Sequence, residues 1–82
     1  HQGYATEAAK AARDYAFTIL KAQRVFAFVR DTNTASMNVA KRCGLKAIDT
    51  IIKHYRNVTM PHIVFVLTQK EWAFLKSQDQ NS

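Results

Sequence analysis

Hydrophobic spacing near the start of the chain predicts a helix over residues 4–22. Apolar side chains recur at intervals of three and four, which is the spacing of one helix face. They are Ala5, Ala8, Ala9, Ala12, Tyr15, Ala16, Ile19 and Leu20. Lys10, Arg13, Asp14 and Lys21 fall largely on the other side. Because the apolar side chains are mostly alanine, the helix is expected to lie close against its neighbour.

The next segment, RVFAFVR at residues 24–30, is a short apolar run between two arginines. It is too short to form a helix of its own, and it is rich in β-branched and aromatic residues. This composition predicts a strand buried on both faces, as in a parallel sheet.

A second helix is predicted from Thr34 to Cys43, with Ala35, Val39, Ala40 and Cys43 facing inward. The preceding residues 31–33, Asp-Thr-Asn, form a turn and supply N-cap side chains. Gly44 is well placed to end the helix in the left-handed conformation.

The remaining chain predicts a hairpin and a short helix. Residues 45–55 and 62–68 look extended, and residues 57–61 are expected to join them as an antiparallel pair. Thr68 and Glu71 match a capping box that opens a short helix carrying Trp72 and Leu75. From Ser77 to the end, a polar tail is expected to be disordered.

The predicted order is helix, strand, helix, strand, strand, short helix. This order indicates a single α/β (α+β) domain over residues 1–76, followed by a disordered tail at 77–82. A helix packed on a parallel strand belongs to a βαβ unit, and its first strand does not occur in this sequence. We therefore expect a C-terminal part of a larger domain, with the N-terminal strands missing and one ending just before His1.

The missing strand has a consequence for association. Without it, residues 25–29 would form an unpaired, apolar sheet edge, which recruits other chains. We therefore expect a homo-oligomer or pairing with the N-terminal half of the same protein.

The charge balance narrows the class of partner. Twelve Lys and Arg oppose six Asp and Glu, a net charge of +6, which favours nucleic acid, phosphate or anionic lipid. The single cysteine, Cys43, excludes an internal disulfide and fits a reducing compartment. No apolar run approaches the about 20 residues of a membrane span, so a cytoplasmic protein without membrane association is expected.

Two motifs carry the candidate chemistry. The first is GYATEA, in which Gly3 opens the first helix. A helix N-terminus presents free N–H groups and partial positive charge, and a glycine lets a phosphate come close to the backbone. The donors would come from Gln2, Gly3, Tyr4, Ala5 and Thr6. A plain structural helix start is the alternative interpretation.

The second motif follows the predicted strand: Asn33, Ser36 three residues later, and the pair Gly44-Leu45 after a short helix. The two motifs together, in this order around a strand, resemble the GNAT superfamily of acyl-CoA N-acyltransferases. The resemblance covers roughly residues 2–72 and is closest to the branch that includes the ribosomal-protein N-terminal acetyltransferases.

The resemblance implies acetyl-CoA as co-substrate. Its pyrophosphate would lie on the backbone of residues 2–6, where His1 stands at a position that the family usually fills with glycine or another small residue. Asn33 would bond the pantetheine arm, and Lys41, with Arg42, would meet the nucleotide end.

The resemblance also implies transfer of the acetyl group to a primary amine, on a protein N-terminus or a small molecule. Many members place a tyrosine seven residues after the asparagine as general acid, and this chain has Ala40 there. Ser36 is the candidate substitute. The family's base, often a glutamate or a water held by one, belongs to strands outside this sequence.

Other interpretations stay open at this point. RVFAFV is similar to the aromatic strand of an RNA-binding RRM, although valine replaces the glycine and the element order differs. A GNAT-like fragment that binds a cofactor or partner without catalysis is a third possibility. No ligand set accompanies the histidines, so no metal is expected; His62 is expected to make a hydrogen bond in the last strand or to line the acceptor site.

Overall fold

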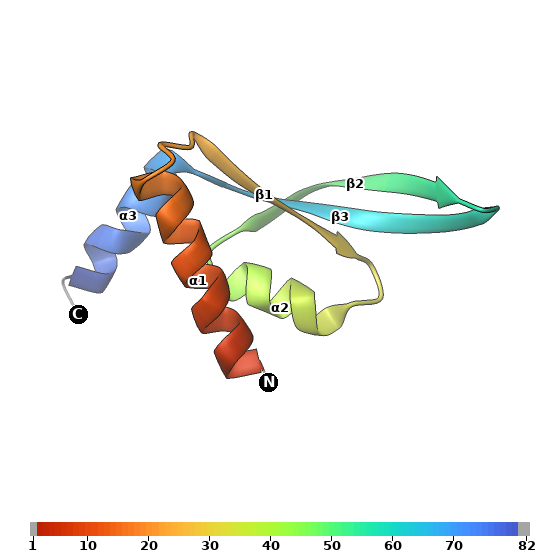
Figure 1. Cartoon of the computed structure of the whole chain (residues 1–82), viewed down its shortest axis with the longest axis horizontal. Helices are drawn as coiled ribbons and strands as arrows, with labels where there is room; N and C mark the ends of the chain where they lie inside the picture. The colour runs from red at the N-terminus through yellow and green to blue at the C-terminus, as the bar shows by residue number, and fades with distance from the viewer. Residues whose placement is uncertain (1, 81–82) are drawn as a thin grey trace.

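The computed structural model describes residues 2–80. Its elements follow the order that the sequence predicts (Figure 1). They are α1 (Gln2–Thr18), β1 (Arg24–Arg30), α2 (Thr34–Arg42), β2 (Lys46–Tyr55), β3 (Val58–Thr68) and α3 (Gln69–Gln80). The predicted fold class is confirmed.

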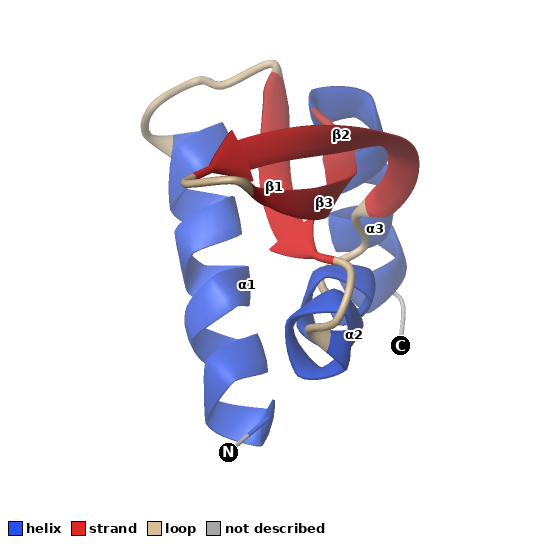
Figure 2. Cartoon of the chain, turned by 90° about the vertical axis from the view of Figure 1, so that its right-hand side faces the viewer, coloured by secondary structure: helices blue, strands red, loops and turns tan. Residues whose placement is uncertain are grey.

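The three strands form one antiparallel sheet in the order β1-β3-β2, with β3 in the middle. Val25 of β1 lies opposite Leu67, and Arg30 lies opposite His62. No strand among residues 2–80 pairs with the outer edge of β1. The helices lie on one side of the sheet (Figure 2), and their side chains share one core cluster with it.

The core lies between the sheet and the helices. It consists of Phe17, Val29, Ala40, Cys43, Leu45, Phe65 and Leu67. The Trp72 ring of α3 stacks on Phe17 with 5.1 Å between ring centroids, and its Nε1 donates to Asp14 Oδ1 at 2.8 Å. Cys43 and Trp72 are thus packing residues, and burial raises the pKa of the Cys43 thiol.

The prediction that β1 is buried on both faces is wrong. Alternate residues of a strand point to opposite faces, and the helices cover only the face that carries Val25, Ala27 and Val29. On the other face, Phe26 and Phe28 are 49% and 54% exposed, and their rings stack with centroids 6.4 Å apart. This uncovered face is called the open face below.

The predicted inner face of α1 is also wrong. Tyr15, Ile19 and Leu20 are exposed, whereas Arg13 and Phe17 are buried. One fully buried phenylalanine removes more apolar surface from water than several alanines do. The helix therefore turns the Phe17 side toward the core. The helix ends at Thr18, short of residue 22, because the chain turns at Lys21, whose φ is +56°.

The second helix follows the prediction except at one inner position. Ser36 N donates to the side chain of Asn33, which caps α2, and Gly44 has a φ of +92°. Val39 is half-buried, and Ala40 and Cys43 are buried. Ala35, predicted to face inward, is exposed in the first turn.

Replacement of Gly44 is expected to destabilise the fold. The left-handed conformation disfavours any Cβ, at a cost of about 1–2 kcal/mol, and a Cβ here would overlap the Leu75 side chain of α3. Gly44→Ala should lower the free energy of unfolding by about 1–3 kcal/mol. Thermal unfolding of the intact protein measures this, and an unchanged midpoint would contradict the packing described.

The hairpin turn is shorter than predicted. Arg56 and Asn57, with φ of +49° and +67°, make the turn alone, as in a two-residue hairpin of the mirror-image type. Strand β3 therefore includes Pro61, which lies opposite Ile52. Proline is tolerated because β1 ends at Arg30, one position before Pro61 would need an N–H for the ladder, while the Pro61 carbonyl oxygen still accepts from Asp31 N at 3.1 Å.

The capping box of α3 is confirmed. Glu71 Oε1 accepts from Thr68 N at 2.9 Å, and Thr68 Oγ1 accepts from Glu71 N at 3.2 Å. Helix α3 continues to Gln80, past Ser77, where the sequence predicted a disordered tail to begin. Residues 81–82 of that tail lie outside the described residues.

The capping box predicts a pH-dependent stability. The pKa of Glu71 is lowered from 4.5 to about 2. The hydrogen bond from the Thr68 N–H contributes most, and the Lys46 ammonium 3.0 Å away contributes next. Because the folded pKa is depressed, the stabilisation is present above pH 4.5 and is lost as the pH falls toward 2. The difference in melting temperature between wild type and Glu71→Gln should therefore shrink over this range. A difference that stays constant down to pH 2 would contradict the assignment.

Candidate functional site

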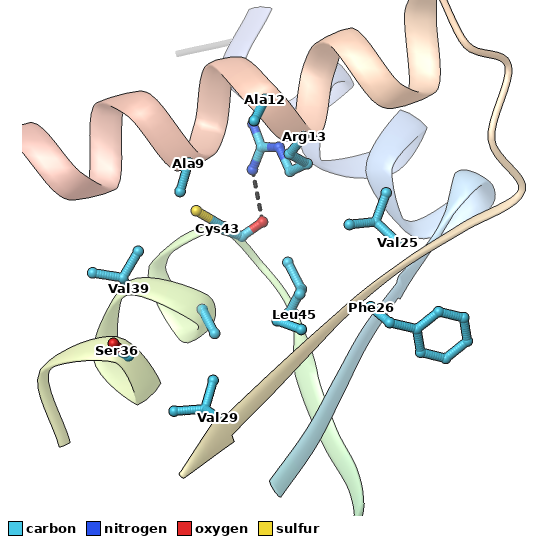
Figure 3. Close-up of a pocket in the computed structure, with 12 residues that line it drawn as sticks. Ala9, Ala12, Arg13, Val25, Phe26, Val29, Ser36, Val39, Cys43 and Leu45 are labelled. Atoms are coloured by element: carbon cyan, nitrogen blue, oxygen red, sulfur yellow. Dashed lines mark hydrogen bonds between the residues drawn. The ribbon is translucent and has the colours of Figure 1, made fainter. Parts of the chain in front are cut away.

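A cavity of about 350 Å³ lies between α1, β1 and α2 (Figure 3). Its lining is mainly apolar and includes Ala9, Ala12, Val25, Val29, Val39, Cys43 and Leu45. Ser36 of α2 brings a hydroxyl to this lining. The cavity borders the unpaired edge of β1, so a ligand or a further chain segment can reach it there.

Arg13 fixes the two helices that flank the cavity. Its side chain is buried, and Nη1 donates to the Cys43 carbonyl oxygen at 2.7 Å. A cation at a helix C-terminus satisfies a carbonyl that lacks an intrahelical partner. The sequence pattern predicted that Arg13 faces solvent. Its burial is favourable because the side chain donates to the carbonyl oxygen of Cys43, thirty positions away in the chain.

Arg13 is held in turn by Asp14. Arg13 Nε donates to Asp14 Oδ1 at 3.0 Å, and Lys76 Nζ contacts Oδ2 at 3.2 Å. Partial burial alone would raise the pKa of Asp14, but hydrogen bonds from Trp72, Lys76 and Arg13 hold it below its ordinary value. This cluster joins α1 to α3 and keeps α1 in place.

At the N-terminus of α1, four of the five predicted phosphate donors can be described in full. Gly3, Tyr4 and Ala5 are exposed in the first turn, where backbone N–H groups have no intrahelical acceptor. Thr6 is only 6% exposed, and its Oγ1 has no hydrogen-bond partner among residues 2–80. A buried hydroxyl without a partner costs about 1–3 kcal/mol, so Thr6 is a feature that folding alone does not account for.

Asn33 and Ser36 lie together, as the sequence predicted for one motif. Asn33 Oδ1 accepts from the Ser36 backbone N–H at 3.1 Å. This bond uses the amide oxygen of Asn33 and leaves its NH₂ group for a ligand. The Ser36 hydroxyl takes no part in the cap and lies beside the cavity.

Lys41 does not join these residues. It is exposed in the last turn of α2, and the length of this helix separates it from Asn33. The described residues thus place Ser36 and Asn33 in one locus and Lys41 at another.

Two further classes of site find no support in residues 2–80. No three His, Cys, Asp or Glu side chains in this range gather as metal ligands would. None of the helices in the same range is long and apolar enough to cross a membrane.

The mixed fold thus has a capped helix after an edge strand and a glycine in the first turn of the preceding helix. Residues 1–46, more than half of the chain, match the family model described as an acetyltransferase (GNAT) domain. The chain belongs to this family.

Solved structures give the same answer about the fold. An acetyltransferase of the GNAT family from Bacillus anthracis is 28% identical, with a TM-score of 0.77 over 84% of this chain and 43% of its own. Mutant forms of the spermidine/spermine N-acetyltransferase SpeG from Vibrio cholerae are 18% identical, with a TM-score of 0.81 over 92% and 46%. SpeG in complex with manganese ions is 19% identical, with a TM-score of 0.78 over 89% and 44%.

The coverage percentages also show what share of each related structure the chain matches. It spans less than half the length of the solved structures that it matches.

Proposed function

We propose that the protein carrying this chain transfers an acetyl group from acetyl-CoA to a primary amine. The observation that carries the proposal is the buried Thr6 hydroxyl, which has no partner in the described part of the chain and lies directly after the exposed first turn of α1. A phosphate seated on that turn would supply the missing acceptor. The backbone N–H groups at the helix start and the helix dipole would bind the same anion.

The residues present fit acetyl-CoA. Gln2, Gly3, Tyr4, Ala5 and Thr6 would hold the pyrophosphate. The amide NH₂ of Asn33 would donate to a pantetheine carbonyl, and the exposed Lys41 would meet the nucleotide end. The net charge of +6 suits a ligand with several phosphate charges.

Ser36 is the proposed general acid. The amine nitrogen attacks the thioester carbonyl, a C–N bond forms, and the C–S bond breaks. The leaving sulfur needs a proton, which the Ser36 hydroxyl would give. Its position at the lining of the cavity, outside the cap hydrogen bond, leaves this hydroxyl available.

The acceptor is proposed as a protein N-terminus or a small-molecule amine. The resemblance to the ribosomal-protein branch favours the first, and the names of the SpeG structures favour a polyamine. At 18% identity, SpeG shares the fold and carries no substrate assignment to this chain.

The experiment is a thiol-release assay on the intact protein with acetyl-CoA. Spermidine and a peptide with a free N-terminus serve as acceptor probes, and the N-acetylated peptide is the matched control. Release of CoA with a free amine, and none with the blocked peptide, supports the proposal. Binding of acetyl-CoA without transfer to either probe would favour a non-catalytic module.

An RNA-binding function is the second candidate, because Phe26 and Phe28 are exposed side by side on the open face. Aromatic side chains on a sheet stack with bases in RNA-binding modules. Binding through several phosphates weakens steeply with salt. Single-stranded RNA that binds with a steep salt dependence, together with no affinity for acetyl-CoA, would favour this candidate.

A further inference from the structure

His62 occupies the open face beside the end of β1. It lies on the central strand β3, opposite Arg30 of β1 and Ile51 of β2, and it is half-buried. The three helices pack on the other face. None of the helices of residues 2–80 therefore covers the His62 ring on the open face (Figure 2).

One hydrogen bond assigns the ring nitrogens. His62 Nδ1 lies 2.9 Å from the Met60 carbonyl oxygen. A carbonyl oxygen only accepts, so Nδ1 carries the proton in this bond. In the neutral ring, Nε2 then has a free lone pair and can take a proton. The predicted hydrogen bond of His62 is confirmed. It fixes the tautomer of the neutral ring, with the proton on Nδ1 and the lone pair on Nε2.

Backbone contacts join the strand that carries His62 to the loop that leads to the proposed acetyl-CoA residues. Asp31 N donates to the carbonyl oxygen of Pro61, the residue before His62, at 3.1 Å, and Asn33 N donates to Arg30 O at 2.9 Å. The loop that carries Asn33 is thus tied both to the strand of His62 and to its cross-strand partner.

We propose that His62 is the general base of the acetyl transfer, an inference that rests on the proposed function. Nε2 takes a proton from the ammonium group of the acceptor. The neutral amine forms the C–N bond to the thioester carbonyl carbon as the C–S bond breaks. Ser36 protonates the thiolate and takes the remaining extra proton from the acylated nitrogen, which leaves a neutral amide and restores the Ser36 hydroxyl. His62 finally gives its proton to water.

Charged groups on β1 and β2 lie near His62 on the open face. On β1, Arg30 Nε lies 3.6 Å from Asp31 Oδ1 and has no hydrogen-bond partner among residues 2–80. On β2, Asp49 Oδ1 accepts from Thr50 N at 2.8 Å, and Lys53 Nζ lies 5.6 Å from the Phe28 ring centroid. None of these groups has a described bond to the imidazole, which leaves Nε2 for the acceptor.

Two variants separate a base from a structural side chain. In His62→Asn, the side-chain amide nitrogen can take the place of Nδ1 and donate to Met60 O, but no nitrogen can accept a proton. His62→Ala removes both functions. His54→Asn is the control, because His54 is exposed on the same hairpin and its register, opposite Thr59, puts it on the other face.

With spermidine and the free peptide as probes, both His62 variants should lose about 10²–10⁴-fold in kcat. The affinity for acetyl-CoA should stay unchanged in calorimetry. The acidic limb of the pH–rate profile should disappear in His62→Asn, and added imidazole should restore activity to His62→Ala. His54→Asn should behave like wild type.

Three other outcomes would overturn one or both proposals. Full activity in His62→Asn with an intact pH profile would overturn the base and leave the acetyltransferase proposal standing. Loss of activity in His62→Ala alone, without imidazole rescue, would make His62 structural. A wild-type protein that transfers to neither probe would overturn both proposals.

Discussion

Ser36→Ala is expected to lower kcat for acetyl transfer by about 10²-fold or more, since a positioned general acid contributes about 10²–10⁴-fold. KM for acetyl-CoA should change little, because the hydroxyl acts on the leaving sulfur. Steady-state kinetics on the intact protein provide the measurement.

Ser36→Ala is expected to remove the hydroxyl without disturbing the fold. The cap of α2 uses the backbone N–H of Ser36 and the side chain of Asn33, so alanine at 36 keeps the cap and the melting temperature. Ser36→Thr retains a hydroxyl and should keep much of the activity. Thr34→Ala, an exposed hydroxyl on the same helix, is the matched control. An active Ser36→Ala protein would remove Ser36 from the chemistry.

Thr6→Val should change stability and binding in opposite directions. The buried Thr6 hydroxyl has no partner in the described structure, so a methyl group of similar size removes an unsatisfied polar atom. A gain of about 1 kcal/mol or more in the free energy of unfolding is expected. Acetyl-CoA should bind about 10- to 100-fold more weakly, because a hydrogen bond to a charged phosphate is worth about 1.5–3 kcal/mol.

Calorimetry and thermal unfolding of the same sample measure both effects. Thr6→Ser keeps the hydroxyl and is the control for binding. A Thr6→Val protein with wild-type affinity for acetyl-CoA would show that the hydroxyl serves no phosphate. A loss of stability would show that it has a structural partner.

Local signals in the sequence predicted much of the architecture. The strand 24–30, the cap at Asn33, the left-handed Gly44 and the box formed by Thr68 and Glu71 all depend on neighbouring residues, and the structure contains each of them. The interactions that stabilise these features involve residues only a few positions apart. The local sequence pattern is therefore enough to predict them.

The errors involve partners that are distant in the chain. Arg13 is buried because its acceptor is the carbonyl of Cys43. The exposure of Phe26 depends on which face the helices cover, which its own strand does not encode. The predicted hairpin turn included Pro61, but β3 runs through Pro61, which is possible because β1 ends at Arg30, opposite His62.

The candidate site was predicted in part. The sequence placed Asn33 and Ser36 in one motif, and the structure brings them together. Their roles, and those of Gly3, Thr6 and Lys41, stay predictions. The unsatisfied Thr6 hydroxyl and the tautomer of His62 were out of reach, because both depend on side-chain contacts in the folded chain.

Acetyl-CoA is proposed to lie on the first turn of α1 and the capped start of α2. Titration of acetyl-CoA into the ¹⁵N-labelled intact protein, followed by amide chemical shifts, decides whether it does. The largest shifts are expected at Gly3 to Thr6 and Asn33 to Ser36, with small shifts at the hairpin turn of Arg56 and Asn57. Saturable shifts confined to the open face around Phe26 and Phe28, with none at Gly3 or Asn33, would contradict it.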